Sequence, residues 1–151
     1  MLERISRKER NDLIIAWFAI SVAFSLAFTG GVGVFMGDSL QQTPLGVSLV
    51  YLVLSMVTVG IGFVLHELAQ NFSAMNFGYW AEFRRDNIML VVAVAMASLV
   101  GVVFAAPGAT VIYAKAAGPG LTKRENGLIS AAGPAINLLL CIPFAVLIIA
   151  A

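Results

Sequence analysis

The sequence predicts an all-α integral membrane protein with about four transmembrane helices. Hydrophobic residues make up 60% of its 151 residues and charged residues 11%, whereas soluble domains have about half and about a quarter. The apolar residues fall in four long runs separated by short polar segments. A soluble fold of this length cannot hide so much apolar surface, but a bilayer is itself an apolar solvent. We therefore expect a single membrane domain over residues 1–151.

Each apolar run is long enough to cross a bilayer, which takes roughly twenty residues. The runs cover about residues 13–36, 45–70, 87–106 and 127–151. The first follows a charged lead-in, as in a signal peptide, but it is longer and lacks a small-residue cleavage site. We interpret it as a retained anchor. A loop rich in turn residues joins the first two runs at 37–44.

The polar segments between the later runs carry local signals. Residues 71–86 combine aromatic and arginine side chains, which is typical of a membrane–water interface. Pro107-Gly108 ends the third run, and an irregular or strand segment is expected near 107–115, with Ala109–Tyr113 as a short strand. Thr122 and Glu125 have the spacing of a capping box, which predicts the start of the last helix. Gly60 and Asn137 are expected to serve helix packing and an interhelical hydrogen bond.

The basic residues constrain the topology. Four Lys/Arg precede the first apolar run, none lies in the first loop, two lie in the second and three in the third. The positive-inside rule then places the amino terminus and the second loop in the cytoplasm. Simple alternation would put the basic third loop outside, in conflict with that rule. The third apolar segment is either a full span, which its length favours, or a re-entrant hairpin.

His66 and Glu67 form an ionisable pair within the second apolar run. An ionisable side chain at membrane depth costs about 3 kcal/mol or more, so such residues are functional candidates, unless the pair lies at the interface. His-Glu-x-x-His on a helix places two imidazoles one turn apart for zinc, with the glutamate as general base. Here the fifth position is Gln70.

Several segments in order resemble the site-2 protease family, in particular its short archaeal-type members. The resemblance covers roughly residues 10–150. The segments that carry it are Phe63–Ala69 with Asn71–Gly78, Tyr79–Arg84, Phe104–Gly108, and Ala132–Leu140, which contains a Gly-Pro-x-x-Asn pattern. Members of this family are intramembrane zinc metallopeptidases that cleave membrane-embedded segments.

The resemblance implies roles for three residues. His66 corresponds to the first zinc ligand and Glu67 to the catalytic general base, while Gln70 stands at the position of the second imidazole and is a weak candidate ligand. The family's third ligand is an aspartate in a later Leu-Asp-Gly-type segment, and this sequence ends before one. A catalytic zinc site needs three protein ligands and an open position. We therefore expect a degenerate or incomplete metal site.

Three hypotheses follow. The first is a non-catalytic relative that acts as a subunit of a membrane complex or binds transmembrane segments. The second is a truncated or variant intramembrane zinc metallopeptidase, with zinc as cofactor if it is active and no cofactor otherwise. The third is a small transporter or channel subunit in which His66 and Glu67 belong to an ion path. The expected partners are the lipid bilayer and other membrane proteins, and the net charge of +1 does not suggest nucleic acid.

Overall fold

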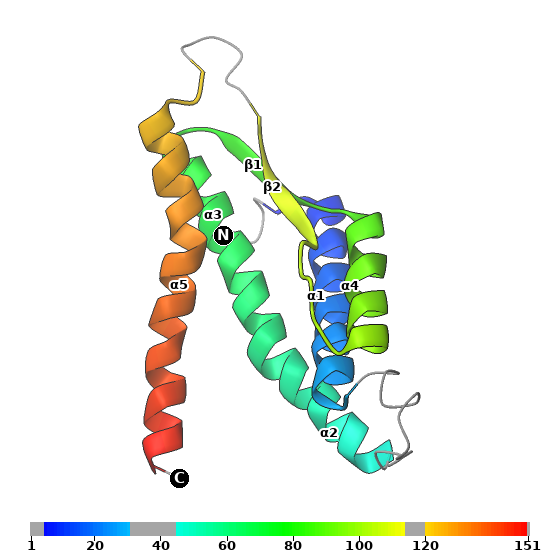
Figure 1. The fold of residues 1–151 in the computed structure, drawn as a ribbon. Coiled ribbons are helices and arrows are strands. Elements are labelled where there is room, and N and C mark those ends of the chain that lie inside the picture. The colour runs from blue at the N-terminus through cyan, green and yellow to red at the C-terminus, as the bar shows by residue number, and fades with distance from the viewer. Residues whose placement is uncertain (1–4, 31–44, 114–119, 151) are drawn as a thin grey trace.

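The structure is a computed structural model that describes residues 5–30, 45–113 and 120–150. Its helices and strands, in chain order, are α1 (Arg7–Phe28), α2 (Leu45–Ser55), η3 (Met56–Gly60), α3 (Ile61–Asn76), β1 (Trp80–Arg85), α4 (Asn87–Val100), β2 (Gly108–Tyr113) and α5 (Lys123–Ala150). The two strands lie at one end of the helices, here called the sheet end (Figure 1). The predicted loop at 37–44 is outside the described residues.

Three of the described helices are long and apolar enough to cross a membrane. They are α1 with 22 residues, the continuous helix Leu45–Asn76 with 32, and α5 with 28. The second is built from α2, η3 and α3, with η3 forming a π-helical turn in the middle. Many of their large apolar side chains are exposed, which suits contact with lipid and not with water.

The third predicted segment, 87–106, is not a helix of that length. α4 has 14 residues, which extend about 21 Å where a bilayer core needs about 30 Å. Gly101 ends it with φ +72°, a left-handed backbone that suits glycine. The Asp86 N–H donates to the Pro107 carbonyl at 2.8 Å. The two ends of the segment between these residues are therefore adjacent, as in a hairpin. Within the described residues, three helices and not four are therefore long and apolar enough to span a membrane. Of the two alternatives for 87–106, the backbone has the form of a hairpin.

A two-stranded sheet corrects the all-α prediction. β1 and β2 pair antiparallel, from Trp80 opposite Tyr113 to Arg85 opposite Gly108. β2 confirms the strand predicted at 109–113. Sequence reasoning missed β1. A half-buried strand is expected to alternate buried and exposed residues. Residues 81–83 of β1 are all buried, so its sequence does not show that alternation.

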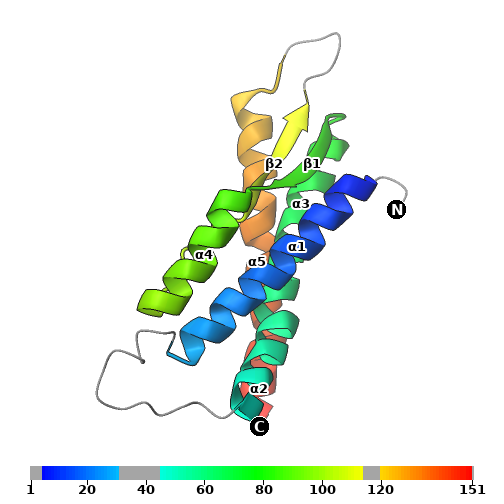
Figure 2. The ribbon, with the colours of Figure 1, turned by 90° about the vertical axis from the view of Figure 1, so that its right-hand side faces the viewer.

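The buried apolar core lies around β1. One cluster joins α1, β1 and α4 through Leu13, Ala16, Phe83 and Leu90. A second joins α3, β1 and α5 through Ala74, Tyr79, Ala81 and Ile129. Ala81 and Phe83 are two residues apart and therefore lie on the same face of β1. The strand joins the two helical groups because it crosses from one to the other along its length (Figure 1, Figure 2).

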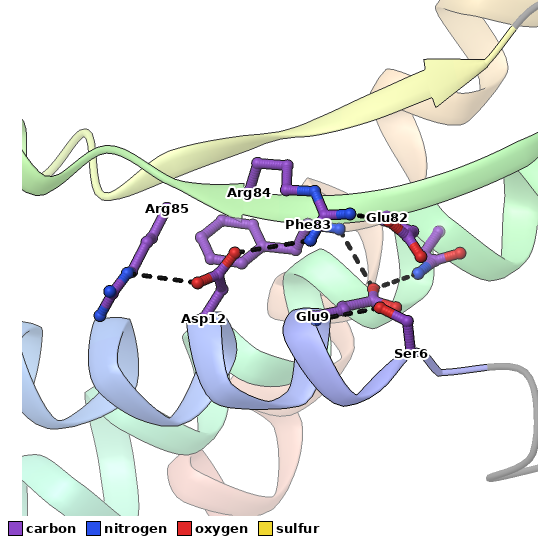
Figure 3. A network of polar contacts seen from close by, with 8 residues as sticks. Ser6, Glu9, Asp12, Glu82, Phe83, Arg84 and Arg85 are labelled. Carbon is purple, nitrogen blue, oxygen red and sulfur yellow. Dashed lines mark hydrogen bonds and ion pairs between the residues drawn. The ribbon is translucent and has the colours of Figure 1, made fainter.

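A buried polar network fastens α1 to β1 and α3 (Figure 3). The carboxylate of Glu9 is fully buried; it accepts hydrogen bonds from the Asn71 side chain and from the Phe83 N–H, the latter at 3.1 Å. One turn along α1, Asp12 pairs with Arg85 at 3.2 Å. Both hydrogen bonds to Glu9 end on Oε1, and the buried Oε2 has no donor among the described residues. The bond from Phe83 and the ion pair of Asp12 tie α1 to β1.

The π-helical turn receives a side chain from α1. The Trp17 indole N–H donates to the Met56 carbonyl at 3.1 Å, a carbonyl in the turn where the helical ladder is altered. A Cβ at position 60 would collide with the Trp17 ring. Gly60 thus allows the close helix packing expected of it.

The amino end of α5 is anchored at the sheet end. The Thr122 hydroxyl accepts from the Glu125 N–H at 3.2 Å, and the Glu125 carboxylate accepts from the Thr122 N–H at 2.9 Å. This reciprocal pair confirms the predicted capping box. The Tyr79 hydroxyl donates to the same carboxylate at 3.0 Å. Burial raises the pKa of the Tyr79 phenol, and its contact with Glu125 raises that pKa further.

Candidate functional site

His66 and Glu67 lie in the first half of α3. His66 is ten residues before the last residue of α3, or about 15 Å along the helix axis. Both residues line a cavity of about 360 Å³, together with residues of α1, the hairpin and α5. The Glu67 side chain is buried. The pair is therefore inside the helix assembly, which favours a functional role over an interfacial one.

Two side-chain amides contact the His66 ring, one at each nitrogen. The Gln70 amide nitrogen is 3.1 Å from Nε2, and the Asn137 amide nitrogen is 3.1 Å from Nδ1. A neutral imidazole has one N–H donor and one acceptor nitrogen. The two NH₂ groups therefore cannot both donate to the ring at once. One of the two amides must instead turn its oxygen toward the ring N–H.

The surroundings decide which amide that is. The Gln70 nitrogen also lies 3.4 Å from the Ser130 carbonyl, which can only accept. Gln70 therefore presents its NH₂ group, and Nε2 of His66 accepts. Nδ1 then carries the proton. It donates to the Asn137 oxygen when the side-chain amide of Asn137 is flipped, which exchanges its oxygen and nitrogen. The exchange also gives a donor to the Asn137 oxygen, which is buried and otherwise lacks one.

A glycine on α5 makes room for the ring. A Cβ at Gly133 would lie 2.6 Å from both Cδ2 and Cε1 of His66, far closer than nonbonded atoms allow. Asn137 follows four residues later and so projects from the same face of α5. The Gly-Pro-x-x-Asn pattern therefore has a physical meaning: the glycine admits the imidazole and the asparagine binds it. This hydrogen bond confirms the interhelical role expected of Asn137.

Glu67 is held from the sheet. Its Oε2 accepts a hydrogen bond from the Thr110 hydroxyl of β2 at 3.1 Å. Sequence reasoning missed Thr110, which is 43 residues further along the chain and sits in the predicted strand like any other strand threonine. Its partner is set by the pairing of β2 with β1, which brings residue 110 over α3. The catalytic role of Glu67 stays a prediction.

The described residues do not fit a zinc ion. Among residues 5–30, 45–113 and 120–150, no three His, Cys, Asp or Glu side chains gather as a metal-binding group. Gln70 lies beside His66 as predicted, but it turns its NH₂ group to Nε2, and an NH₂ group is a donor with no lone pair for a cation. A catalytic zinc site requires three protein ligands, and among the described residues that line this cavity only His66 and Glu67 are of a conventional ligand type.

Comparisons with known proteins relate the chain to an archaeal protein. No family model matches the sequence, and no solved structure matches it. The chain is 32% identical over 146 residues to a protein of Methanocaldococcus jannaschii named "Putative zinc metalloprotease", covering 97% of this chain and 65% of that protein. The chain thus spans slightly less than two thirds of the length of this relative. The similarity supports a relationship with a metalloprotease family.

Proposed function

We propose that this chain is a site-2-protease-like membrane protein that does not cleave peptides with the residues described, and that it binds transmembrane segments within a membrane complex. The hydrogen bond from Gln70 to Nε2 of His66 carries this proposal. In His-Glu-x-x-His helices, position 70 would supply a second imidazole on the same face. Here the residue at that position donates to the first imidazole instead.

The polar groups of the site are satisfied without a metal. Nε2 accepts from Gln70, Nδ1 donates to Asn137, and the Glu67 carboxylate accepts from Thr110. Each such hydrogen bond is worth about 1 kcal/mol, and an unpaired buried group would cost about 1–3 kcal/mol. The arrangement therefore supports a scaffold that stays folded with no ion bound.

The distribution of charge supports a multi-pass placement with a cytoplasmic amino terminus. All seven described Lys/Arg belong to elements that meet at the sheet end: Arg7, Lys8, Arg10, Arg84, Arg85, Lys123 and Arg124. With 87–106 as a re-entrant hairpin, the chain returns to that side before α5 begins. The positive-inside rule is then obeyed with the sheet end in the cytoplasm, and the conflict in the charge count disappears.

The surface of α3 and α5 supports binding of other transmembrane segments. The His66 cavity and a neighbouring cavity of about 370 Å³ meet at Gly62 and Asn137. The last ten residues of α5, 141–150, are exposed and almost entirely apolar. Figure 1 shows α5 diverging from α3 toward the carboxyl end. A partner helix placed there would cover apolar surface and meet small or polar groups, which favour helix association in lipid.

Zinc content tests the proposal. The detergent-purified chain should hold substoichiometric zinc by mass spectrometry of the metal, and one zinc per chain would overturn the proposal. Gln70→His restores the second imidazole, and Gln70→Leu removes the amide without adding a ligand. If the histidine variant alone binds zinc, residue 70 is what disabled the site. If neither binds, a further ligand is also missing.

The alternative function is an intramembrane zinc metallopeptidase that cleaves membrane-embedded peptides. The name of the Methanocaldococcus jannaschii protein favours it, as does the cavity shared by His66 and Glu67. It requires ligands beyond those described. Zinc-dependent cleavage of a membrane-embedded peptide in liposomes, abolished by Glu67→Gln, would establish it.

A further inference from the structure

A third cavity, of about 320 Å³, lies between α1 and α3 and shares no lining residue with the His66 cavity. Its lining is apolar except for one cation, and it consists of Ile5, Arg10, Leu13, Ile14, Trp17, Val64 and Leu68. This cavity is called the α1–α3 groove below.

The groove runs along about two turns of α1. Its α1 residues are spaced three and four apart from Arg10 to Trp17, which places them on one face of the helix. Seven residues of helix extend about 10 Å, so a volume of 320 Å³ gives a mean cross-section of about 30 Å². A helix with side chains is roughly 10–12 Å in diameter, about twice the width that this cross-section gives. A single hydrocarbon chain fits.

The two ends of the groove differ in polarity. Trp17 closes the deep end, where its indole is fixed by the hydrogen bond to Met56. Arg10 stands at the other end, within the charged start of α1, and it is exposed. The nearby carboxylates are engaged elsewhere, Asp12 with Arg84 and Arg85, and Glu9 with Asn71 and Phe83. Among the described residues, no carboxylate forms an ion pair with Arg10.

We propose that the α1–α3 groove binds an anionic phospholipid, with one acyl chain along the groove and the phosphate on Arg10. The apolar walls at membrane depth require an apolar body, and the single cation at the mouth complements a negative headgroup. Basic pockets between transmembrane helices recognise anionic headgroups in this way. The proposal goes beyond the proposed function, because none of its residues belongs to the His66 site.

Bromine-labelled lipid gives a direct readout. The chain has two tryptophans, Trp17 at the floor of the groove and Trp80 in β1. A Trp80→Phe background therefore leaves Trp17 as the reporter. In phosphatidylcholine nanodiscs, a small fraction of phosphatidylglycerol brominated on its acyl chains should quench Trp17 more than the same fraction of brominated phosphatidylcholine.

Three variants test the contacts. Arg10→Gln should weaken the preference for phosphatidylglycerol about fivefold, the effect expected of one cation near a headgroup. Val64→Phe fills the groove and should reduce quenching by both lipids. Lys123→Gln is the matched control, because Lys123 is an exposed cation at the same end of the molecule that does not line the groove; its preference should not change.

Several outcomes would overturn the proposal. Equal quenching by the two lipids, or an equal loss in Arg10→Gln and Lys123→Gln, would mean general surface attraction. A photocrosslinker placed at Ile14, which is 53% exposed, should capture lipid. If it captures a second copy of the chain or another protein, the groove is a protein interface.

Discussion

Replacing Gly133 with alanine tests the packing that holds the His66 ring between α3 and α5. The new Cβ would lie 2.6 Å from two ring atoms, whereas ordinary contact begins at 3.4 Å. Nε2 of the ring would be closer still. The ring or the helices must therefore shift by more than about 0.8 Å, an overpacking that costs typically 1–3 kcal/mol. The ring cannot turn away freely, because Gln70 and Asn137 each hold one nitrogen.

The other contributions to the free energy of unfolding are smaller. Losing one ring hydrogen bond costs about 1 kcal/mol, and the higher helix propensity of alanine returns about 1 kcal/mol. We expect a net loss of about 1–3 kcal/mol. Gly127→Ala on the same helix is the control, because a Cβ there meets nothing within 4 Å; it should be neutral or stabilising by up to about 1 kcal/mol.

The assay is reversible unfolding in mixed micelles of sodium dodecyl sulfate and dodecyl maltoside, followed by far-ultraviolet circular dichroism. The midpoint for Gly133→Ala should fall at a lower fraction of sodium dodecyl sulfate than that for Gly127→Ala. Equal midpoints would refute the close approach of α5 to the His66 ring, and with it the reading of the Gly-Pro-x-x-Asn pattern.

Two further predictions concern the sheet end. Glu9→Leu leaves the Asn71 amide and the Phe83 N–H without their acceptor and should cost about 2–4 kcal/mol in the same unfolding assay; Glu9→Gln keeps an acceptor oxygen and should cost less, and equal losses would contradict the network. Because burial and then Glu125 raise the pKa of Tyr79, the folded chain holds the phenolic proton more tightly than the unfolded chain. Stability present below about pH 10 should therefore decline as the pH rises through the folded pKa, and an equal decline in Tyr79→Phe would contradict this.

The apolar helices of spanning length and several element ends depend on local sequence, and these predictions were confirmed. Spanning helices follow from the length of apolar runs, which needs no knowledge of neighbours. The start of α5 at Lys123 follows from a capping box whose two partners are three residues apart. The strand at 109–113 also matched a local pattern of β-branched and aromatic residues.

The hairpin and β1 depended on distant contacts. An apolar run of twenty residues is the same in composition whether it crosses the bilayer once or turns back within it. The hydrogen bond between Asp86 and Pro107 distinguishes the two, and it joins residues 21 positions apart. β1 forms because β2 pairs with it and because Glu9, more than seventy residues earlier, accepts its Phe83 N–H.

The sequence by itself determined that His66, Glu67 and Gln70 share one apolar helix and that the usual second imidazole is replaced by an amide. It did not determine what that amide does. The partners Asn137, Ser130 and Thr110 come from segments 43 to 71 residues away. A hydrogen bond forms only when donor and acceptor atoms lie about 3 Å apart. Only the packing of α5 and β2 against α3 brings those atoms within reach, and so only the tertiary structure decided that Gln70 donates to His66.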